Sequence, residues 1–196
     1  MQLVFASSNK NKINEINSLI GQTFLVKGLE DIGITEEIPE PGTSIKENSF
    51  LKADYVRNFL KNKGELSLVF ADDSGLEVEA LNNAPGVYSA RYAGVLKNDE
   101  ANNLKLLKEL NLVTNRKASF VTVITLIRNE EIHYFEGEIK GTIAYAARGE
   151  NGFGYDPLFI PQGYRSTFAE LNSETKNTIS HRAIAVNKLL RYLNNL

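Results

Sequence analysis

The chain has 196 residues, 42% of them hydrophobic and 23% charged, a composition that excludes wholesale disorder and allows a sizeable core. Its net charge of −2 gives no electrostatic reason to bind a nucleic-acid polymer or an anionic membrane, so we expect neither as a partner. There are no cysteines and only two histidines, which excludes thiolate catalysis and leaves mainly oxygen ligands for a metal, favouring Mg²⁺ and allowing Mn²⁺.

The first third of the chain alternates predicted strands and helices. Residues 2–6 are typical of a short buried strand and have no basic lead-in, so we expect a cytoplasmic protein without a signal peptide. Apolar residues at helical spacing predict a helix over residues 9–21, and a second strand follows around residues 24–29. Ser44 then begins an S-x-x-E capping box, which predicts a helix that runs to about Gly64.

The next segment is predicted to hold two strands and a helix. Residues 66–71 and 76–81 each resemble a strand, and Ser74–Gly75 is expected to turn the chain between them. A helix is predicted from about Asp99 to Leu110, with Leu104, Leu107 and Leu110 on one face.

The last part contains the longest predicted strands. Residues 118–129 and 131–149 are rich in Val, Ile, Thr, Tyr and Phe, which predicts an antiparallel hairpin with its turn at Asn129–Glu130. A glycine-rich loop and a C-terminal helix opened by residues 175–182 follow. We therefore predict one domain over residues 1–196, an α/β fold with a mixed, elongated central sheet and flanking helices that form two lobes around a cleft.

The turn between the first strand and helix carries small polar and basic residues. A helix N-terminus favours an anion, because its backbone N–H groups and dipole point toward the ligand. A simple helix cap with solvated lysines explains the same residues equally well, and the glycines of a Walker P-loop are absent. The segment comprises Ser7, Ser8, Asn9, Lys10, Asn11 and Lys12.

Three carboxylates are candidates for chemistry. Asp72 and Asp73 are adjacent in a strand-like segment, so their side chains should point to opposite faces, and a structural turn is as good an explanation as a site. Glu40 lies on a stiff loop between Pro39 and Pro41. Together with Asp73 it could hold one Mg²⁺, which would offset the cost of burying the acids.

Two further segments carry aromatic and basic groups. Phe153, between Gly152 and Gly154, could stack on a planar base, although a buried ring at a bend is the simpler explanation. Lys176, His181 and Arg182 lie within seven residues at the predicted last helix, where cations oppose the dipole unless an anion or a carbonyl oxygen is bound.

Taken together, these motifs closely resemble the inosine triphosphate pyrophosphatase family, which hydrolyses non-canonical purine nucleoside triphosphates. The resemblance extends from residue 3 to about residue 190 and rests on S-x-N-x-x-K at Ser7, ADDSGLEVEALNNAPGVYSARYAG, GFGYDPLF and ISHR, in that order. The sequence departs from the family only at Asn151, where a glycine is common.

The resemblance implies Mg²⁺ dependence, a homodimer and a role for each segment. Asp73 would accept the proton of the attacking water and bind metal with Glu40. The triphosphate would contact residues 7–12, Lys52 and Ser74. The base and sugar would contact Phe153, Gly154, Tyr155, Asp156, Lys176, His181 and Arg182.

The expected reaction converts XTP, ITP or dITP into the monophosphate and pyrophosphate, which keeps these nucleotides out of DNA and RNA. Two alternatives are a house-cleaning pyrophosphatase for modified pyrimidine nucleotides and a non-catalytic nucleotide sensor. A sensor has little use for two carboxylates near a polyanion, so the acids argue against it.

Overall fold

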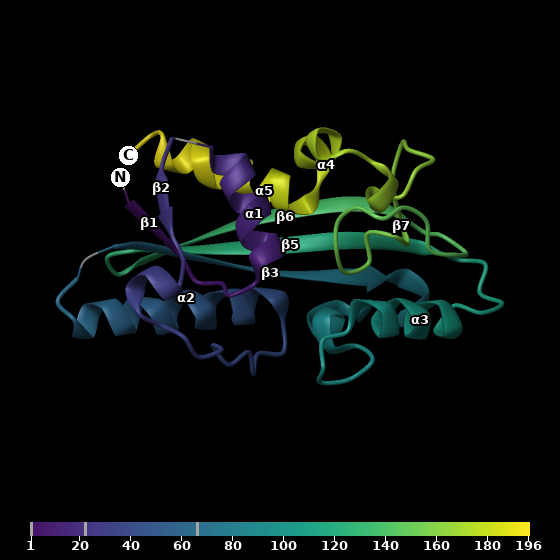
Figure 1. Cartoon of the computed structure of the whole chain (residues 1–196), viewed down its shortest axis with the longest axis horizontal. Helices are drawn as coiled ribbons and strands as arrows, with labels where there is room; N and C mark the ends of the chain where they lie inside the picture. Colours follow the sequence, from purple (N-terminus) through teal and green to yellow (C-terminus); the bar gives the residue numbers. More distant parts are fainter. Residues whose placement is uncertain (1, 22, 66) are drawn as a thin grey trace. The chain divides into compact units, whose positions relative to one another are not determined.

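The structure is a computed structural model that describes residues 2–21, 23–65 and 67–196. Its seven strands, counted over these residues, form one sheet in the order β2-β1-β3-β5-β6-β7, with β4 paired to β3 (Figure 1). Strands β1 and β2 are parallel, as are β1 and β3, whereas β4 and β7 pair antiparallel with β3 and β6. The predicted mixed α/β sheet with flanking helices is therefore confirmed.

The strands are β1 (Gln2–Phe5), β2 (Leu25–Lys27), β3 (Leu68–Val78), β4 (Ala84–Pro85), β5 (Lys117–Arg128), β6 (Glu131–Ile143) and β7 (Phe159–Pro161). The α-helices are α1 (Lys10–Ile20), α2 (Ile45–Asn62), α3 (Asp99–Glu109), α4 (Ser173–Ile179) and α5 (His181–Leu193). Short 3₁₀ turns cover Glu30–Ile32, Glu79–Leu81, Gly86–Arg91 and Phe168–Glu170. None of the helices formed by the described residues is long and apolar enough to cross a membrane.

The chain divides into two compact units. Unit 1 contains the described residues up to Asp73, together with Thr122–Glu136 and Ala183–Leu196. Unit 2 contains Ser74–Val121 and Gly137–Arg182. Strands β3, β5 and β6 each contribute residues to both units. The predicted single domain stays a prediction.

Unit 1 has a helical layer on each face of its strands. Alternate residues such as Phe5 and Phe70 pack against α1 and α5, and their rings stack at 4.7 Å. The residues on the other face of these strands, such as Val69 and Ala71, pack against α2. In Figure 1, α1 and α5 accordingly lie above these strands and α2 below them. This alternation is the period of two expected for a strand covered on both faces.

Unit 2 has its own apolar core. Phe120 of β5 packs against Phe159 and Phe168, and Leu106 of α3 and Leu110, the residue after this helix, join the same cluster.

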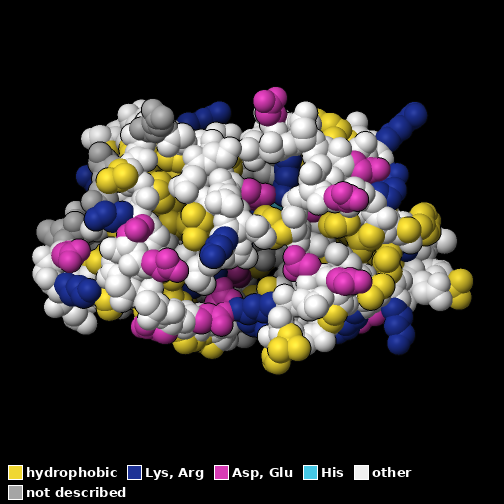
Figure 2. Space-filling view, viewed as in Figure 1, with side chains coloured by type: hydrophobic (Ala, Val, Ile, Leu, Met, Phe, Trp, Pro, Cys, Tyr) yellow, Lys and Arg dark blue, Asp and Glu magenta, His cyan; other side chains and the backbone are white. Residues whose placement is uncertain are grey.

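Charges of both signs are interspersed over the face of the molecule shown in Figure 2, without a wide field of one sign. That distribution fits the net charge of −2.

Several local predictions hold. Helix α1 ends before Gly21, whose φ of 62° explains the choice of glycine. The β5–β6 hairpin turns at Asn129–Glu130, with Asn129 at a φ of 56°. Ser44 caps α2, because its hydroxyl accepts from the Glu47 amide at 3.1 Å. The Glu47 carboxylate accepts from the Thr43 amide at 2.7 Å and not from the Ser44 amide, so only half of the predicted capping box forms.

Other local predictions are wrong. The two strands expected at residues 66–71 and 76–81 are one strand, β3, which runs through Ser74 and Gly75 without a turn. Leu66 lies outside the described residues. Strand β6 ends at Ile143 and not at residue 149. A continuous strand lets β3 pair with β1 at one end and with β4 at the other, which a turn would prevent.

Two helices also differ from expectation. The predicted face of α3 is wrong for Leu104, which is 61% exposed, whereas Leu107 and Leu110 pack in the core of unit 2 as expected. The residues of α3 that are fully buried are Asn102 and Leu106, because leucines three apart drift away from the buried stripe. The segment 175–182 does not open one helix. Lys176 lies in the short helix α4, Ser180 separates the helices, and His181 begins α5.

Candidate active site

The adjacent acids of β3 point to opposite faces, as predicted. Asp72 has the parity of Phe70 and meets α1, where its Oδ1 lies 3.1 Å from Lys12 Nζ. Asp73 has the parity of Ala71 and meets α2, where its Oδ1 lies 3.4 Å from Lys52 Nζ. Each carboxylate is therefore balanced by a lysine that is far away in sequence, which removes the apparent repulsion between neighbours.

Glu40 joins Asp73 at the same cation. Lys52 Nζ lies 2.5 Å from Glu40 Oε1, and its side chain is only 9% exposed. Burial alone would lower the pKa of Lys52, but Asp73, Glu40 and Asp72 together raise it, so this amine is protonated. Two acids from distant segments thus converge on one buried ammonium.

The carboxyl group of Asp73 is a stronger base than an ordinary aspartate. Burial raises its pKa, Lys52 and Lys12 partly oppose that rise, and Glu40 and Asp72 add to it. A raised pKa favours proton acceptance from water.

The pair fits a hard divalent cation. Glu40 and Asp73 offer carboxylate oxygens that already share one positive charge, which is the donor chemistry that Mg²⁺ requires. In the part of the chain that the structure describes, no group of three or more acidic or histidine side chains could hold a metal. Mg²⁺ commonly takes one or two protein carboxylates and completes its shell with substrate phosphates and water, so two acids suffice.

The turn between β1 and α1 forms a complete helix cap. Asn9 Oδ1 accepts from the amides of Asn11 at 3.0 Å and Lys12 at 3.2 Å, and Ser7 Oγ accepts from the Asn9 amide. Ser8 and Lys10 are exposed beside it, whereas Ser7 is nearly buried. The geometry matches the simple-cap explanation. Phosphate binding by residues 7–12 stays a prediction.

In unit 2, Asp156 organises the loop that carries Phe153. Its Oδ2 accepts from the Phe153 amide at 2.9 Å and lies 2.5 Å from Lys176 Nζ, with both side chains under 10% exposed. Gly152 has a φ of 78°, and a Cβ there would overlap the Asp156 carboxylate. Asp156 therefore holds the loop through buried contacts.

Phe153 is half-buried and lies near two cations. Lys176 Nζ lies 5.2 Å from the ring centroid and the Arg182 guanidinium carbon lies 5.7 Å from it. Arg182 is 2% exposed and donates to Ser74 Oγ at 3.1 Å. His181 stacks on Phe120 at 4.6 Å with ring planes only 8° apart. This cluster combines an aromatic face with hydrogen-bond donors.

Gly154 and Tyr155 are held by the surrounding structure. The Gly154 amide donates to Asp99 Oδ2 at 2.7 Å, and its carbonyl accepts from Asn103 Nδ2 at 2.9 Å. Tyr155 is buried in the core of unit 2 and its hydroxyl donates to the Ser89 carbonyl. Both residues support the loop, and their predicted contacts to a ligand are not tested by this geometry.

The structure thus forms two clusters from the predicted residues. Unit 1 joins Lys12 to Asp72, and Glu40 and Asp73 to Lys52. Unit 2 joins Ser74, Phe153, Asp156, Lys176 and Arg182.

Two buried polar residues of α2, Asn48 and Ser49, lie outside the predicted set although they neighbour the unit 1 cluster. Their spacing to Lys52 on an otherwise apolar helical face is the signal that could have found them.

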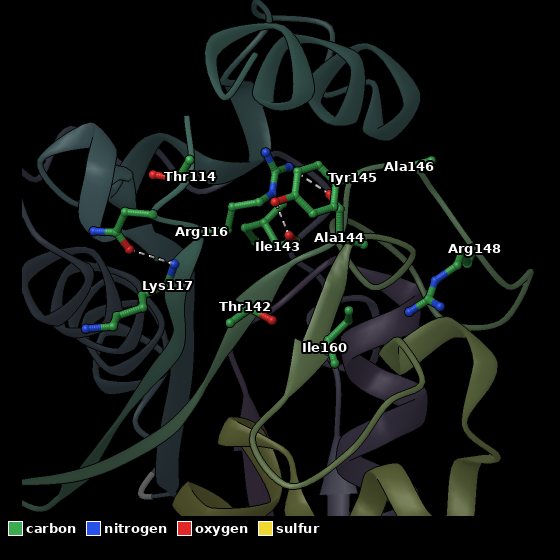
Figure 3. Close-up of a pocket in the computed structure, with 11 residues that line it drawn as sticks. Thr114, Arg116, Lys117, Thr142, Ile143, Ala144, Tyr145, Ala146, Arg148 and Ile160 are labelled. Carbon is green, nitrogen blue, oxygen red and sulfur yellow. Dashed lines mark hydrogen bonds between the residues drawn. The ribbon is translucent and has the colours of Figure 1, made fainter. Parts of the chain in front are cut away.

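A separate pocket of about 830 Å³ in unit 2 is lined by Arg116 and Tyr145, among other residues (Figure 3). At its wall, each nitrogen of the Arg116 guanidinium donates to a backbone carbonyl, of Ile143, Leu110 and Ala144, and the Tyr145 ring lies 4.5 Å away. None of the predicted site residues lines this pocket, so we do not assign the activity to it.

Comparison with known proteins identifies the relatives of this chain. The sequence profile of the Ham1 family matches residues 3–192. The dITP/XTP pyrophosphatase of Porphyromonas gingivalis is 51% identical over 193 residues, covering 98% of this chain and 97% of that protein.

Two solved structures are similar over the full chain. The Ham1 protein of Staphylococcus aureus has a TM-score of 0.87 and 42% identity, covering 100% of this chain and 99% of that one. A Ham1 protein from Coxiella burnetii has a TM-score of 0.88 and 37% identity, with both chains fully covered. These matches confirm the resemblance found in the motifs, and the chain belongs to the Ham1 family.

Proposed function

We propose that this chain is a dITP/XTP pyrophosphatase that hydrolyses XTP, ITP and dITP to the monophosphate and pyrophosphate and so cleanses the nucleotide pool. The observation that carries the proposal is the convergence of Glu40 and Asp73 on Lys52. It is supported by 51% identity to a protein named for this activity.

In the proposed reaction, two acids, three lysines and one hydroxyl act on the phosphate chain. Glu40 and Asp73 would hold Mg²⁺, which would supply charge neutralisation at the phosphate oxygens. Asp73 would accept a proton from the attacking water, aided by the pKa that burial raises. Lys10, Lys12 and Lys52, with the hydroxyl of Ser74, would position the triphosphate for in-line attack.

The residues of unit 2 would take the base and sugar. Phe153 would stack on the purine, and donors from Arg182 or His181 would meet the oxygen at C6. Adenine presents an amino group at that position, which is itself a donor. The donors of the site would then face another donor and stay unpaired, which disfavours ATP. Guanine shares the C6 oxygen, so its rejection depends on the amino group at C2.

We further infer a homodimer in the cytoplasm. The dimer rests on the family resemblance, and the compartment rests on the role, because the nucleotide pool used for nucleic-acid synthesis is intracellular. Size-exclusion chromatography with light scattering measures the first, and a monomer at micromolar concentration would contradict it.

The decisive test is a nucleotide panel with Mg²⁺ in which pyrophosphate and phosphate are scored separately. We expect XTP, ITP and dITP to release pyrophosphate, ATP and GTP to react far more slowly, and EDTA to abolish the reaction. Equal kcat/KM for ATP and ITP would contradict the C6 argument. Preference for modified pyrimidine triphosphates would indicate a different house-cleaning enzyme, and binding without pyrophosphate release would indicate a sensor.

A further inference from the structure

The buried face of helix α2 is unusual in composition. Its C-terminal half buries Ala53, Val56 and Leu60 against strands β1 and β3, as a core helix should. Its N-terminal half instead buries Asn48, Ser49 and Lys52, which are 1%, 0% and 7% exposed. Burying three polar side chains is costly unless each makes specific polar contacts, and each of these three does.

Asn48 holds the loop that carries Glu40. Its side-chain oxygen accepts from the Gly42 amide at 2.7 Å in a buried bond. Gly42 leaves no space for a side chain, because a Cβ there would lie 2.5 Å from the same Asn48 oxygen. The backbone two residues after Glu40 is therefore fixed to α2, and Pro41 between them restricts the intervening backbone.

Ser49 holds the strand that carries Asp73. Its hydroxyl lies 3.0 Å from the Ala71 carbonyl, to which it donates, and accepts from the Thr125 amide at 3.0 Å. The Thr125 hydroxyl lies 2.8 Å from the same oxygen. One hydroxyl thus joins α2 to both β3 and β5. Its contact on β3 is Ala71, two residues before Asp73.

Lys52 follows on the same helical face, four residues after Asn48 and three after Ser49. Side chains at these spacings lie together on a helix. Lys52 meets Glu40 at 2.5 Å and Asp73 at 3.4 Å, so the helix sets the position of both carboxylates and of the cation between them.

We propose that Asn48 and Ser49 are positioning residues that set the separation between Glu40 and Asp73. Asn48 fixes the Glu40 loop, and Ser49 fixes strand β3. Lys52 lies between the two acids and contacts both. The inference deepens the proposed function, since it rests on these acids holding the metal and acting on water. Groups that orient metal ligands are typically worth about 10- to 100-fold in metal affinity or activity.

The test uses Asn48→Ala and Ser49→Ala in the full chain, with Ser89→Ala as the matched control. Ser89 is also a buried serine whose hydroxyl joins two backbone groups, donating to the Gly86 carbonyl at 2.6 Å and accepting from the Leu76 amide at 2.9 Å. It lies in unit 2 and has no assigned role in the reaction. Urea unfolding of all three variants corrects for general loss of stability.

The first readout is Mn²⁺ binding to the nucleotide-free protein. It is measured from the electron paramagnetic resonance signal of free Mn²⁺. We expect Asn48→Ala and Ser49→Ala to weaken binding by about 10-fold or more, and Ser89→Ala to change it less than about twofold. The second readout is steady-state turnover of XTP, where we expect kcat to fall by about 10-fold or more at saturating substrate and metal. Equal behaviour of Ser49→Ala and Ser89→Ala would overturn the proposal.

A crystal structure of the metal-free Ser49→Ala variant keeps the question separate from the proposed activity. We expect the contact from Lys52 Nζ to Asp73, which is 3.4 Å in the wild type, to lengthen beyond 4.0 Å. If both acids stay within 4.0 Å of Lys52 in that structure, the positioning role is wrong, whatever the enzyme hydrolyses. If the wild-type protein releases no pyrophosphate but the contact opens, the proposed function fails while the positioning role stands. If Asn48→Ala does not fold, Ser49→Ala still decides the outcome.

Discussion

The clusters of unit 1 and unit 2 differ in the sign of their charge balance. The unit 1 cluster has three carboxylates, Glu40, Asp72 and Asp73, against the two ammonium groups of Lys12 and Lys52. The unit 2 cluster has one carboxylate, Asp156, against Lys176 and Arg182, and both cations lie near the ring of Phe153.

The two balances favour different kinds of ligand. An excess of one carboxylate is relieved by adding a divalent cation, as proposed for the unit 1 cluster. An excess of positive charge around an aromatic face favours a planar ring with acceptor oxygens, as proposed for the unit 2 cluster. Substitutions in each cluster test this division.

The largest effect is expected from Asp73→Asn. Loss of a positioned proton acceptor should lower kcat by about 10²–10⁴-fold. The KM for XTP should change far less, because unit 2 is assigned the base. Steady-state kinetics with pyrophosphate detection measures both values, and Ser89→Ala serves as the unrelated control. Retention of more than about a tenth of wild-type kcat would rule out the proton-acceptor role.

Lys176→Met should have the largest effect on stability. It leaves the Asp156 carboxylate, which is 4% exposed, without its 2.5 Å cation. Breaking such a buried pair typically costs about 3–5 kcal/mol of unfolding free energy. Urea unfolding measures the loss, and the double variant Asp156→Asn with Lys176→Met should recover part of it. A loss below about 1 kcal/mol in the single variant would mean that the pair is solvated, as exposed pairs are.

Phe153→Ala should mainly affect substrate binding. A base stacked on an aromatic ring contributes about 1–3 kcal/mol, so the KM for XTP should rise by roughly 5- to 150-fold. Phe153→Leu is the matched control, because it keeps an apolar side chain without the aromatic face and should recover only part of the affinity. A fall in kcat with an unchanged KM would place Phe153 in the chemical step and break the division between the units.

The smallest effect concerns pH. Burial raises the Asp73 pKa above the ordinary value of 3.8, so in the metal-free protein its carboxyl group should titrate above that value by ¹³C NMR. The folded protein then binds this proton more tightly than the unfolded chain does. The contribution of Asp73 to stability is therefore greatest below the unfolded pKa and is lost as pH rises through the folded pKa.

Urea unfolding of wild-type protein and Asp73→Asn across the acidic range measures this dependence. The stability of the wild type relative to the variant should fall as pH rises. An increase over the same range would mean that Lys52 and Lys12 dominate and lower the Asp73 pKa instead.

Much of the fold could be predicted from local patterns. The helices α1 and α2, their caps and the β5–β6 hairpin follow from apolar periodicity, Asn9, Ser44 and the turn at Asn129. The turn expected at Ser74–Gly75 failed because strand pairing on both sides outweighs the local preference of these residues for turns. The predicted face of α3 failed only at Leu104, because three leucines fit more than one helical stripe.

The acids themselves were visible in the sequence, but their partners were not. The opposite directions of Asp72 and Asp73 follow from the period of a strand. Which lysine each one meets depends on which helix covers which face of the sheet, and that is set by the packing of Ile16 and Val56 in separate cores. Asn48 and Ser49 belong to no motif, and their helical spacing to Lys52 is their one signal in the sequence, whereas the hydrogen bonds that they make are seen only in the folded chain.

The sequence by itself therefore determined the family, the mixed sheet and the residue types available for chemistry. The tertiary structure decided that Lys12 balances Asp72, that Lys52 joins Glu40 to Asp73, and that burial raises the Asp73 pKa. The physical reason is range. Periodicity, capping and turn preferences act over a few neighbouring residues, whereas charge pairing and desolvation depend on groups that only folding brings together.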